Sequence, residues 1–247
     1  MTAVLRRLGV LGGMGPLAGA TFVLRLVQLT PAGNDQEHIP LLLCNDPEIP
    51  DRSSACMGDG PSPLPAMLRG IETLVVGGVD CIVIPCNTAH LWFDQLQAAS
   101  PVPLLHIVKS VVVDLRRQGV TQGKVGILGT PATIAMGLYQ RYLSAAGYES
   151  IELSPEDVQR LCVPAIVAVK GNRIDEAFAP AAEGIRLLAQ QGANAVVLGC
   201  TELPLAVPPK RRGEFGIVLT DSIDALALDA IDMLRPTAPS TPSTPTS

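Results

Sequence analysis

Short apolar runs alternate with amphipathic stretches along most of the chain. Runs of Val, Ile and Leu bounded by Gly, Pro or Asp are typical of buried strands, and apolar residues spaced three or four apart are typical of helices. The runs predict strands near 6–11, 39–44, 79–85, 103–107, 124–129, 149–153, 194–199 and 216–220. The periodic stretches predict helices near 16–29, 64–76, 89–98, 109–118, 132–146, 155–169, 174–191 and 222–234. This alternation favours an α/β fold with parallel sheets and crossover helices.

Segments of the first half recur in the second half. Gly-Val-Leu-Gly-Gly-Met-Gly, beginning at Gly9, returns as Gly-Ile-Leu-Gly-Thr-Pro-Ala from Gly126, an offset of 117 residues. Two apolar runs end in Cys86 and Cys200, an offset of 114, and a third, looser pair of runs shares that offset. Three elements in the same order indicate an internal duplication.

The duplication predicts two pseudo-symmetric lobes, each a parallel sheet flanked by helices, with the active site in the cleft between them. We expect residues 1–104 with 213–235 to form the first lobe and 105–212 the second, although the sequence does not settle whether the last strand and helix return to the first lobe. Residues 236–247 are Pro, Ser and Thr with a single Ala. Such a tail lacks the apolar surface needed to fold, so we expect disorder.

Composition narrows the function classes. The chain has 247 residues, of which 47% are hydrophobic and 17% charged, with a net charge of −5. No basic run is available to follow a phosphate backbone, which argues against nucleic acid as a partner. The uncharged stretch 8–24 is short for a membrane span. Its glycines and its mid-chain repeat also argue against a twin-arginine signal after Arg6 and Arg7, so we expect no membrane association.

Six cysteines lie mostly in apolar runs and form no dense disulfide framework. This usage is typical of a reducing compartment, and we expect a cytoplasmic protein.

A glycine-rich turn follows the first predicted strand and opens a helix. Gly12-Gly13-Met14-Gly15 would place backbone N–H groups of Gly13 and Met14 at a helix N-terminus, which favours an anion. The pattern is not Gly-x-Gly-x-x-Gly, so a small carboxylate is a better candidate ligand than a dinucleotide. A plain strand-to-helix turn remains an equal alternative.

The matched thiols are the strongest chemical signal. Cys86 and Cys200 each follow a buried strand, at the sheet edge where α/β folds bind ligands. A single buried cysteine often only fills space, but a pair in duplicated positions favours catalysis. A following helix N-terminus would lower the pKa of each thiol. Polar residues come next in both copies: Asn87 and Thr88, then Thr201 and Glu202.

Other residues allow further hypotheses. Cys86 and His90, with Cys81 nearby, resemble part of a metal site, but zinc needs three or four converging ligands and the second copy lacks a histidine. We therefore expect no metal. Arg52 ends a turn-rich loop and is suited to a substrate carboxylate. Lys170, at the end of a helical stretch, either stabilises that helix end or reaches the same cleft.

Four segments together resemble aspartate racemases of the aspartate/glutamate/hydantoin racemase superfamily. They are Gly-Val-Leu-Gly-Gly-Met-Gly-Pro-Leu-Ala, Asp-Pro-Glu-Ile-Pro-Asp-Arg, Pro-Cys-Asn-Thr-Ala-His and Leu-Gly-Cys-Thr-Glu-Leu, and the similarity covers nearly all of 6–235. The resemblance implies two α/β lobes, a cofactor-independent isomerase and a homodimer. It implies catalytic Cys86 and Cys200, with substrate contacts from Asn87, Thr88, Thr130 and Thr201 and carboxylate binding by Arg52 and Lys170 beside Asp51.

The resulting hypothesis is a two-thiol racemase that acts on a small acidic amino acid, aspartate first and glutamate second. Two alternatives remain. One is an enzyme similar to maleate isomerase or arylmalonate decarboxylase that acts on a dicarboxylate. The other is a binding protein for acidic amino acids that has lost the chemistry.

Overall fold

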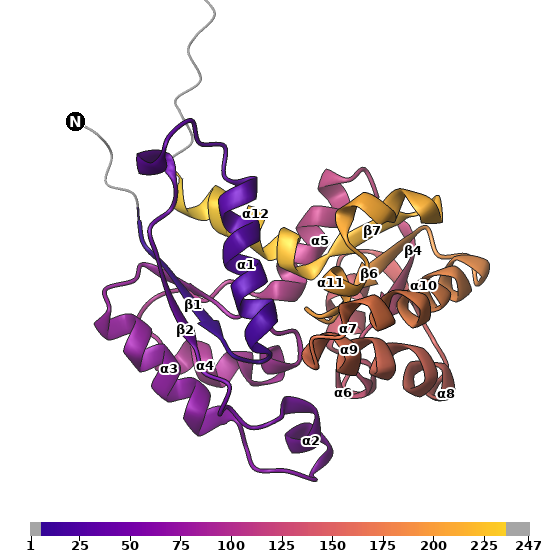
Figure 1. Ribbon diagram of the computed structural model, residues 1–247, viewed down its shortest axis with the longest axis horizontal. Coiled ribbons are helices and arrows are strands. Elements are labelled where there is room, and N and C mark those ends of the chain that lie inside the picture. The colour runs from indigo at the N-terminus through magenta and orange to yellow at the C-terminus, as the bar shows by residue number, and fades with distance from the viewer. Residues whose placement is uncertain (1–5, 236–247) are drawn as a thin grey trace, which may run out of the picture.

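The chain folds into two parallel sheets, each flanked by helices, which confirms the predicted α/β class (Figure 1). The computed structural model describes residues 6–235, and the predicted disordered tail, 236–247, lies outside them. The first sheet has the order β2-β1-β3, with β1 (Leu8–Gly12), β2 (Leu41–Asn45) and β3 (Cys81–Val83). The second has the order β5-β4-β6-β7, with β4 (Gly123–Leu128), β5 (Tyr148–Glu152), β6 (Ala195–Leu198) and β7 (Val218–Asp221).

Helices connect consecutive strands. In the first half these are α1 (Pro16–Leu29), η1 (Asp35–Glu37), α2 (Arg52–Met57), α3 (Leu64–Val76), η2 (Thr88–Trp92), α4 (Phe93–Ala99) and α5 (Ile107–Arg117). In the second half they are α6 (Pro131–Ala135), α7 (Leu138–Ala145), α8 (Pro155–Asp157), η3 (Val158–Cys162), α9 (Val163–Lys170), α10 (Ile174–Gln190), α11 (Leu203–Ala206), η4 (Pro209–Phe215) and α12 (Ser222–Leu234). No helix within 6–235 combines the length and apolar character needed to cross a membrane.

The strand registers repeat between the sheets. Gly9 in β1 pairs with Ile82 in β3, and Gly126 in β4 pairs with Val196 in β6. The two pairs are related by the offsets of 117 and 114 seen in the sequence. The repeated segments therefore occupy equivalent places in the two sheets.

The last strand lies in the second sheet and not in the first lobe, where the expected boundary 213–235 placed it. Leu219 of β7 pairs with Val196, just as Leu104 forms a lone parallel bridge with Ile82 in the first sheet. β7 is thus the second-copy equivalent of the segment around Leu104. Only the last helix, α12, returns to the first half of the chain, where it packs against α1 and α5.

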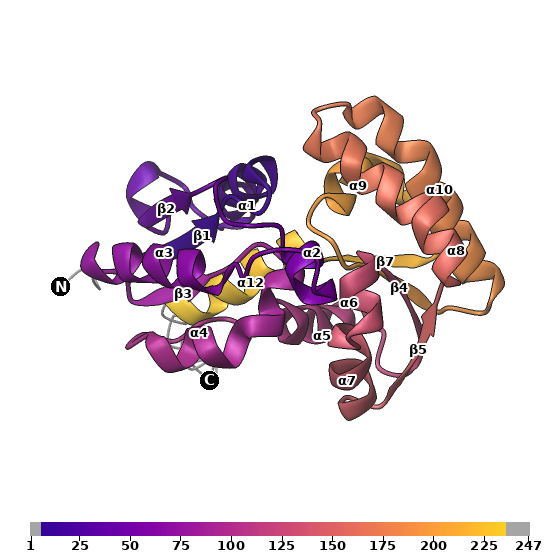
Figure 2. The same ribbon diagram turned by 90° about the horizontal axis from the view of Figure 1, so that it is seen from below.

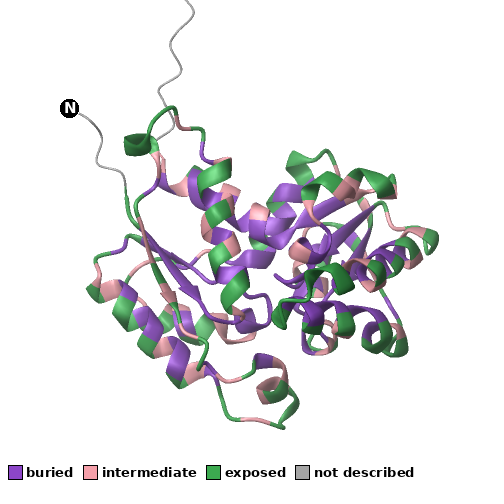
Figure 3. Cartoon of the chain, in the orientation of Figure 1, coloured by how far each residue is buried: buried purple, intermediate pink, exposed green. Residues whose placement is uncertain are grey.

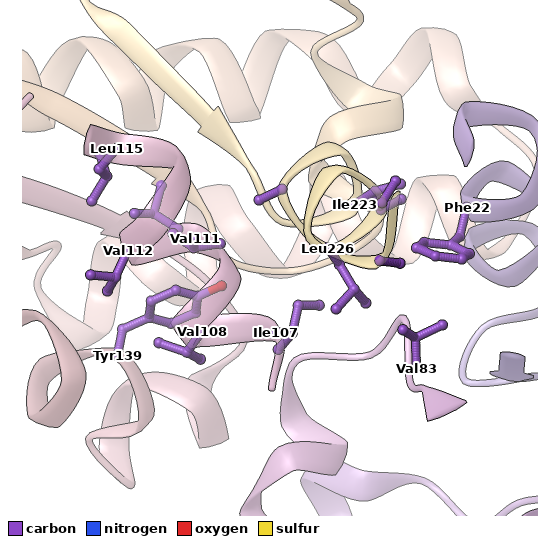
Figure 4. Packing of buried hydrophobic residues seen from close by; sticks show 14 of the residues in the cluster. Phe22, Val83, Ile107, Val108, Val111, Val112, Leu115, Tyr139, Ile223 and Leu226 are labelled. Carbon is purple, nitrogen blue, oxygen red and sulfur yellow. The ribbon is translucent and has the colours of Figure 1, made fainter. Parts of the chain in front are cut away.

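The packing of α5 and α12 joins the two halves. One hydrophobic cluster includes Phe22 of α1, Ile107 of α5, Tyr139 of α7 and Leu226 of α12. Figure 4 shows α12 end-on, with Leu226 directed toward Ile107. Phe22 lies on the opposite side of α12 from the labelled residues of α5. Seen from below, β1, β2 and β3 lie on one side of this junction and β4, β5 and β7 on the other (Figure 2).

Local features differ from the predicted elements in several places. The strand predicted over 103–107 forms only the bridge at Leu104, and the helix predicted over 155–169 comprises α8, η3 and α9. The single helix predicted over 132–146 is divided into α6 and α7 at Gly137, whose φ of 64° is left-handed. The short helix α2 was not predicted, since its capping residue Asp51 lies in a loop rich in turn residues. Most strand residues are buried, whereas the helices have one buried and one exposed side (Figure 3).

Candidate active site

Both repeated thiols follow the carboxyl ends of central strands. Cys86 lies three residues beyond β3 and Cys200 two residues beyond β6, and they are 5% and 6% exposed. The backbone N–H of Cys86 donates to the carbonyl oxygen of Ile84 at 2.7 Å, which turns the chain sharply after the strand. The carboxyl ends of parallel strands are where α/β folds place their ligands.

The two thiols line one small cavity between the two halves. Its volume of about 20 Å³ leaves room for roughly one water molecule. The remaining lining residues are Met14, Asp51, Arg52, Ser53, Asn87, Thr88, Thr130, Lys170, Thr201 and Glu202. The structure therefore brings nine of the ten predicted site residues together. The tenth, Gly13, lines a neighbouring hollow of about 300 Å³ that shares Asp51, Arg52, Lys170 and Glu202 with the cavity.

Arg52, which lines the cavity, has one hydrogen-bond donor without an acceptor within residues 6–235. It is 7% exposed, and its Nη1 donates to the carbonyl oxygens of Ile49 at 3.1 Å and Pro50 at 2.9 Å. Its Nε is buried and has no hydrogen-bond partner among residues 6–235. Because a buried charged donor left unpaired is costly, this group is suited to a ligand that supplies an acceptor.

An ion pair joins the two halves at the cavity. Lys170, in the last turn of α9, lies 3.8 Å from the carboxylate of Asp51. Burial raises the pKa of Asp51, but the hydrogen bond from the Ser54 N–H and the nearby charges of Lys170 and Arg52 outweigh it and lower that pKa. The Asp51 side chain thereby both caps α2 and faces a lysine from the opposite lobe.

Asn87 is anchored by two side-chain hydrogen bonds. Its Oδ1 accepts a hydrogen bond from the Tyr139 hydroxyl at 2.5 Å, and its Nδ2 donates to the Ser222 hydroxyl at 3.0 Å. Both partners belong to elements of the second repeat. Its amide thus connects the first thiol's loop to α7 and α12.

Three threonine hydroxyls form a second cross-repeat contact. The Thr88 hydroxyl lies 3.2 Å from that of Thr130 and 3.1 Å from that of Thr133. Thr130 also caps α6 by accepting from the Thr133 N–H. All three are buried, and Thr88 and Thr130 line the cavity.

Cys200 has a carboxylate neighbour. Its thiol donates to Glu202 Oε2 at 2.9 Å, while Glu202 Oε1 accepts from the Gly15 N–H at 3.3 Å. Burial, and then the Glu202 carboxylate, raise the pKa of Cys200 well above its ordinary value. The sequence-based expectation of a lowered pKa is therefore wrong for this thiol, since Glu202 opposes the thiolate.

The turn at Gly13 requires glycine. Its φ is 96°, and a Cβ would lie 2.0 Å from the carbonyl oxygen of Asp46. This close approach brings the start of α1 to the hollow, which residues 15–18 help to line. The Gly15 N–H at the start of α1 donates to the Glu202 carboxylate, and a negative charge is favoured at a helix N-terminus.

The metal hypothesis for His90 finds no support in its contacts. Its Nδ1 bonds to the Cys86 carbonyl oxygen, and its Nε2 accepts from the Ile107 N–H. Both ring nitrogens are therefore occupied by the backbone. Within 6–235, no three residues of the His, Cys, Asp and Glu types are placed to share a metal ion.

The comparisons with known proteins agree with this geometry. The Asp/Glu/hydantoin racemase family model matches residues 11–230. The chain belongs to this family. The resemblance seen in the sequence is thereby confirmed at the level of the family.

Individual relatives cover different shares of the chain. The aspartate racemase of Picrophilus torridus superposes with a TM-score of 0.81 at 31% identity, covering 93% of this chain and 94% of its own. The broad-specificity amino-acid racemase RacX of Bacillus subtilis is 33% identical over 150 residues, 58% of this chain and 63% of its own. A glutamate racemase of Aquifex pyrophilus is 29% identical over 61% of this chain and 57% of its own length. The matches to these two curated relatives thus span less than two thirds of each relative.

The cavity adds three residues to the predicted set: Asp51, Ser53 and Glu202. Asp51 and Ser53 flank Arg52, and Glu202 comes two residues after Cys200. Their positions were visible in the sequence, but only the contact at 2.9 Å shows that Glu202 engages the thiol.

Proposed function

We propose that the protein is a cofactor-independent racemase that interconverts the L and D forms of a small acidic amino acid, with aspartate as the first candidate and glutamate as the second. The observation that carries this proposal is the pair of repeated thiols that line one cavity together with Arg52, whose buried Nε has no hydrogen-bond partner within residues 6–235. The full-length match to an aspartate racemase at 31% identity supports the choice of aspartate.

The reaction transfers one proton off the α-carbon and returns another to its opposite face. One thiolate removes the α-proton, and the C–H electron pair moves into the adjacent carboxylate to give an enolate. The opposite thiol then donates its proton to the planar carbon, which leaves the first cysteine protonated and the second a thiolate. Pre-organised donors stabilise the enolate charge. The candidates are the backbone N–H groups near Gly13 and Met14, with Asn87, Thr88 and Thr201.

Charge complementarity favours a dicarboxylic substrate. Arg52 offers an unpaired Nε, and Lys170 contributes a second positive group from the other lobe. Thr130 adds a hydroxyl beside Thr88. A guanidinium pairs well with a carboxylate in a site that excludes water.

The cavity is smaller than an amino acid, so the walls must separate for the substrate to enter. The neighbouring hollow, which shares Arg52, Lys170 and Glu202 with the cavity, is the proposed entrance. Closure after entry would then exclude water from the thiols.

A homodimer is part of the proposal. Large apolar side chains are exposed along α1, where Leu24 is 55% and Val27 45% exposed, and on the outer strand β2, where Leu43 is 39% exposed. Such neighbouring apolar groups are typical of a subunit contact. Light scattering on the purified protein would give twice the chain mass if this holds and the chain mass if it does not.

A cytoplasmic location is also proposed. All six cysteines, including the pair in the cavity, are free thiols. A reducing compartment keeps both thiols available for proton transfer.

Proton NMR in deuterated water tests the function. The reduced protein with L-aspartate should lose the α-proton signal while D-aspartate appears, and L-glutamate gives the matched comparison of side-chain length. Turnover of maleate or of an arylmalonate without α-proton exchange would replace the racemase by a dicarboxylate enzyme. Thermal stabilisation by aspartate without any turnover would replace it by a binding protein.

A further inference from the structure

The two thiol loops are held in different ways. In the second copy, the Cys200 carbonyl oxygen accepts from the backbone N–H of Leu203 at 2.9 Å, within its own turn. In the first copy, the Cys86 carbonyl oxygen is bound by a side chain, Nδ1 of His90, at 2.9 Å. The position equivalent to His90 in the second copy is Pro204. The duplication has therefore kept the turn but changed what fixes it.

The protonation of His90 follows from its partners. The Ile107 N–H lies 3.1 Å from Nε2, and a backbone N–H can only donate. Nε2 must accept, so Nδ1 carries the hydrogen that it donates to Cys86. The side chain is 4% exposed, and burial lowers the pKa of His90 to about 4, which keeps this neutral tautomer at neutral pH.

Neighbouring rings fix the plane of the imidazole. Phe93 stacks on it with ring centroids 5.8 Å apart, and His106 packs at 4.8 Å. His106 in turn packs on Tyr142 of α7 at 4.5 Å. The imidazole thus lies between the Cys86 loop and the first turn of α5, which itself packs against α7 and α12.

We propose that His90 is a positioning residue for Cys86, because its Nδ1–H holds the Cys86 carbonyl oxygen, while the Ile107 N–H keeps the imidazole in the tautomer that makes this bond. The catalytic consequence rests on the proposed racemase function, but the positioning itself does not. Cys200, whose turn is closed by its own backbone, has no such dependence.

Two substitutions separate the arms of the bridge. The side-chain amide nitrogen of Asn lies where His Nδ1 lies, so His90→Asn keeps a donor for the Cys86 carbonyl and loses the Ile107 contact. The side-chain amide of Gln reaches the position of Nε2, so His90→Gln keeps an acceptor for Ile107 and loses the donor to Cys86. His106→Asn is the matched control, because it alters the same ring cluster without touching the Cys86 carbonyl and retains a side chain able to cap α5.

The primary readout is the alkylation rate of each thiol by iodoacetamide, followed by peptide mass spectrometry. His90→Gln should raise the Cys86 rate at least about fivefold, because the loop loosens around a buried thiol. His90→Asn and His106→Asn should stay within about twofold of the wild type, as should Cys200 in all three variants. In racemisation assays, His90→Gln should lower kcat about tenfold with little change in KM, and His90→Asn should recover most of that loss.

The outcomes separate the two proposals. Equal alkylation changes in His90→Gln and His90→Asn, or parallel changes at Cys86 and Cys200, would overturn the positioning role. Absence of racemisation in the wild type would overturn the enzyme proposal, while the alkylation pattern would still decide the role of His90.

The wild-type protein gives a second test that does not depend on the folding of a variant. A long-range proton–nitrogen NMR spectrum distinguishes the two neutral tautomers of a histidine. His90 should show a protonated Nδ1 and an unprotonated Nε2 at pH 7. A protonated Nε2 or a charged ring at that pH would contradict the proposed bridge.

Discussion

The loops of Cys86 and Cys200 occupy equivalent places in the two repeats but have different surroundings. Cys200 donates to the Glu202 carboxylate, and its carbonyl is closed by its own backbone. Cys86 is followed by an amide and a hydroxyl that reach the second repeat, and its carbonyl is bound by His90. Duplication thus supplies a symmetric scaffold, and side chains one to four residues beyond each thiol make the two half-sites chemically distinct.

Loss of either thiol should have the largest effect. Cys86→Ser and Cys200→Ser should each lower kcat for racemisation about 10³-fold, because a two-base reaction needs both groups. Chiral chromatography of the aspartate product measures this. Cys44→Ser, a half-buried thiol outside the cavity, should retain wild-type activity. Retention of activity by either catalytic-thiol variant would reduce the mechanism to a single base.

Removal of the Glu202 charge should change one half-site only. Glu202→Gln keeps the size of the side chain but removes the carboxylate that accepts the hydrogen bond from the Cys200 thiol and raises the Cys200 pKa. The pH dependence of alkylation should shift to lower pH for Cys200 and stay fixed for Cys86. Equal shifts at both thiols would show that Glu202 acts on the whole cavity.

Burial of His90 predicts an acid sensitivity of the first half-site. Its folded-state pKa of about 4 is below the ordinary 6.5, so its stabilising contribution is present above pH 6.5 and is lost as the pH falls toward 4. Burial, with smaller contributions from His90 and Lys109, lowers the pKa of His106 further, to about 3. Between pH 7 and pH 5, the wild type should lose about 2 kcal/mol more unfolding free energy than His90→Asn, by urea titration. Identical losses would place the acid sensitivity elsewhere.

Tyr139→Phe should change stability by an amount similar to the acid effect at His90. It removes the hydroxyl that donates to Asn87 Oδ1 and leaves a buried acceptor without that partner. We expect a loss of about 1–3 kcal/mol in unfolding free energy with a fold similar to the wild type. Circular dichroism during urea titration measures both. A neutral result would mean that the Asn87 amide finds another donor.

The sequence was most informative where the duplication and local patterning agreed. The offset between Gly9 and Gly126, and between Cys86 and Cys200, was enough to predict two similar parallel sheets and to select the thiols. The sequence left open which sheet the last strand joins, since the pairing of β7 with β6 depends on contacts far apart in the chain. The short helix α2 was not predicted because the residues before it are typical of a turn.

The sequence could not predict the site roles that depend on a single tertiary contact. Glu202 stood next to the predicted site, but nothing in its spacing shows a carboxylate oxygen 2.9 Å from the thiol. His90 was considered as a metal ligand because its residue type and its spacing from Cys86 allow that role. Its two backbone partners, one of them at Ile107, are set by the tertiary structure.

The most direct test of the central claim is the position of deuterium at low conversion. L-Aspartate is incubated with the enzyme in deuterated water. The two enantiomers are then separated, and the deuterium content of each is measured by mass spectrometry. A two-thiol mechanism predicts deuterium at the α-carbon of the D-aspartate formed and almost none in the recovered L-aspartate, because the two faces use different protons. Equal deuterium in both enantiomers would indicate one base serving both faces and would contradict the account.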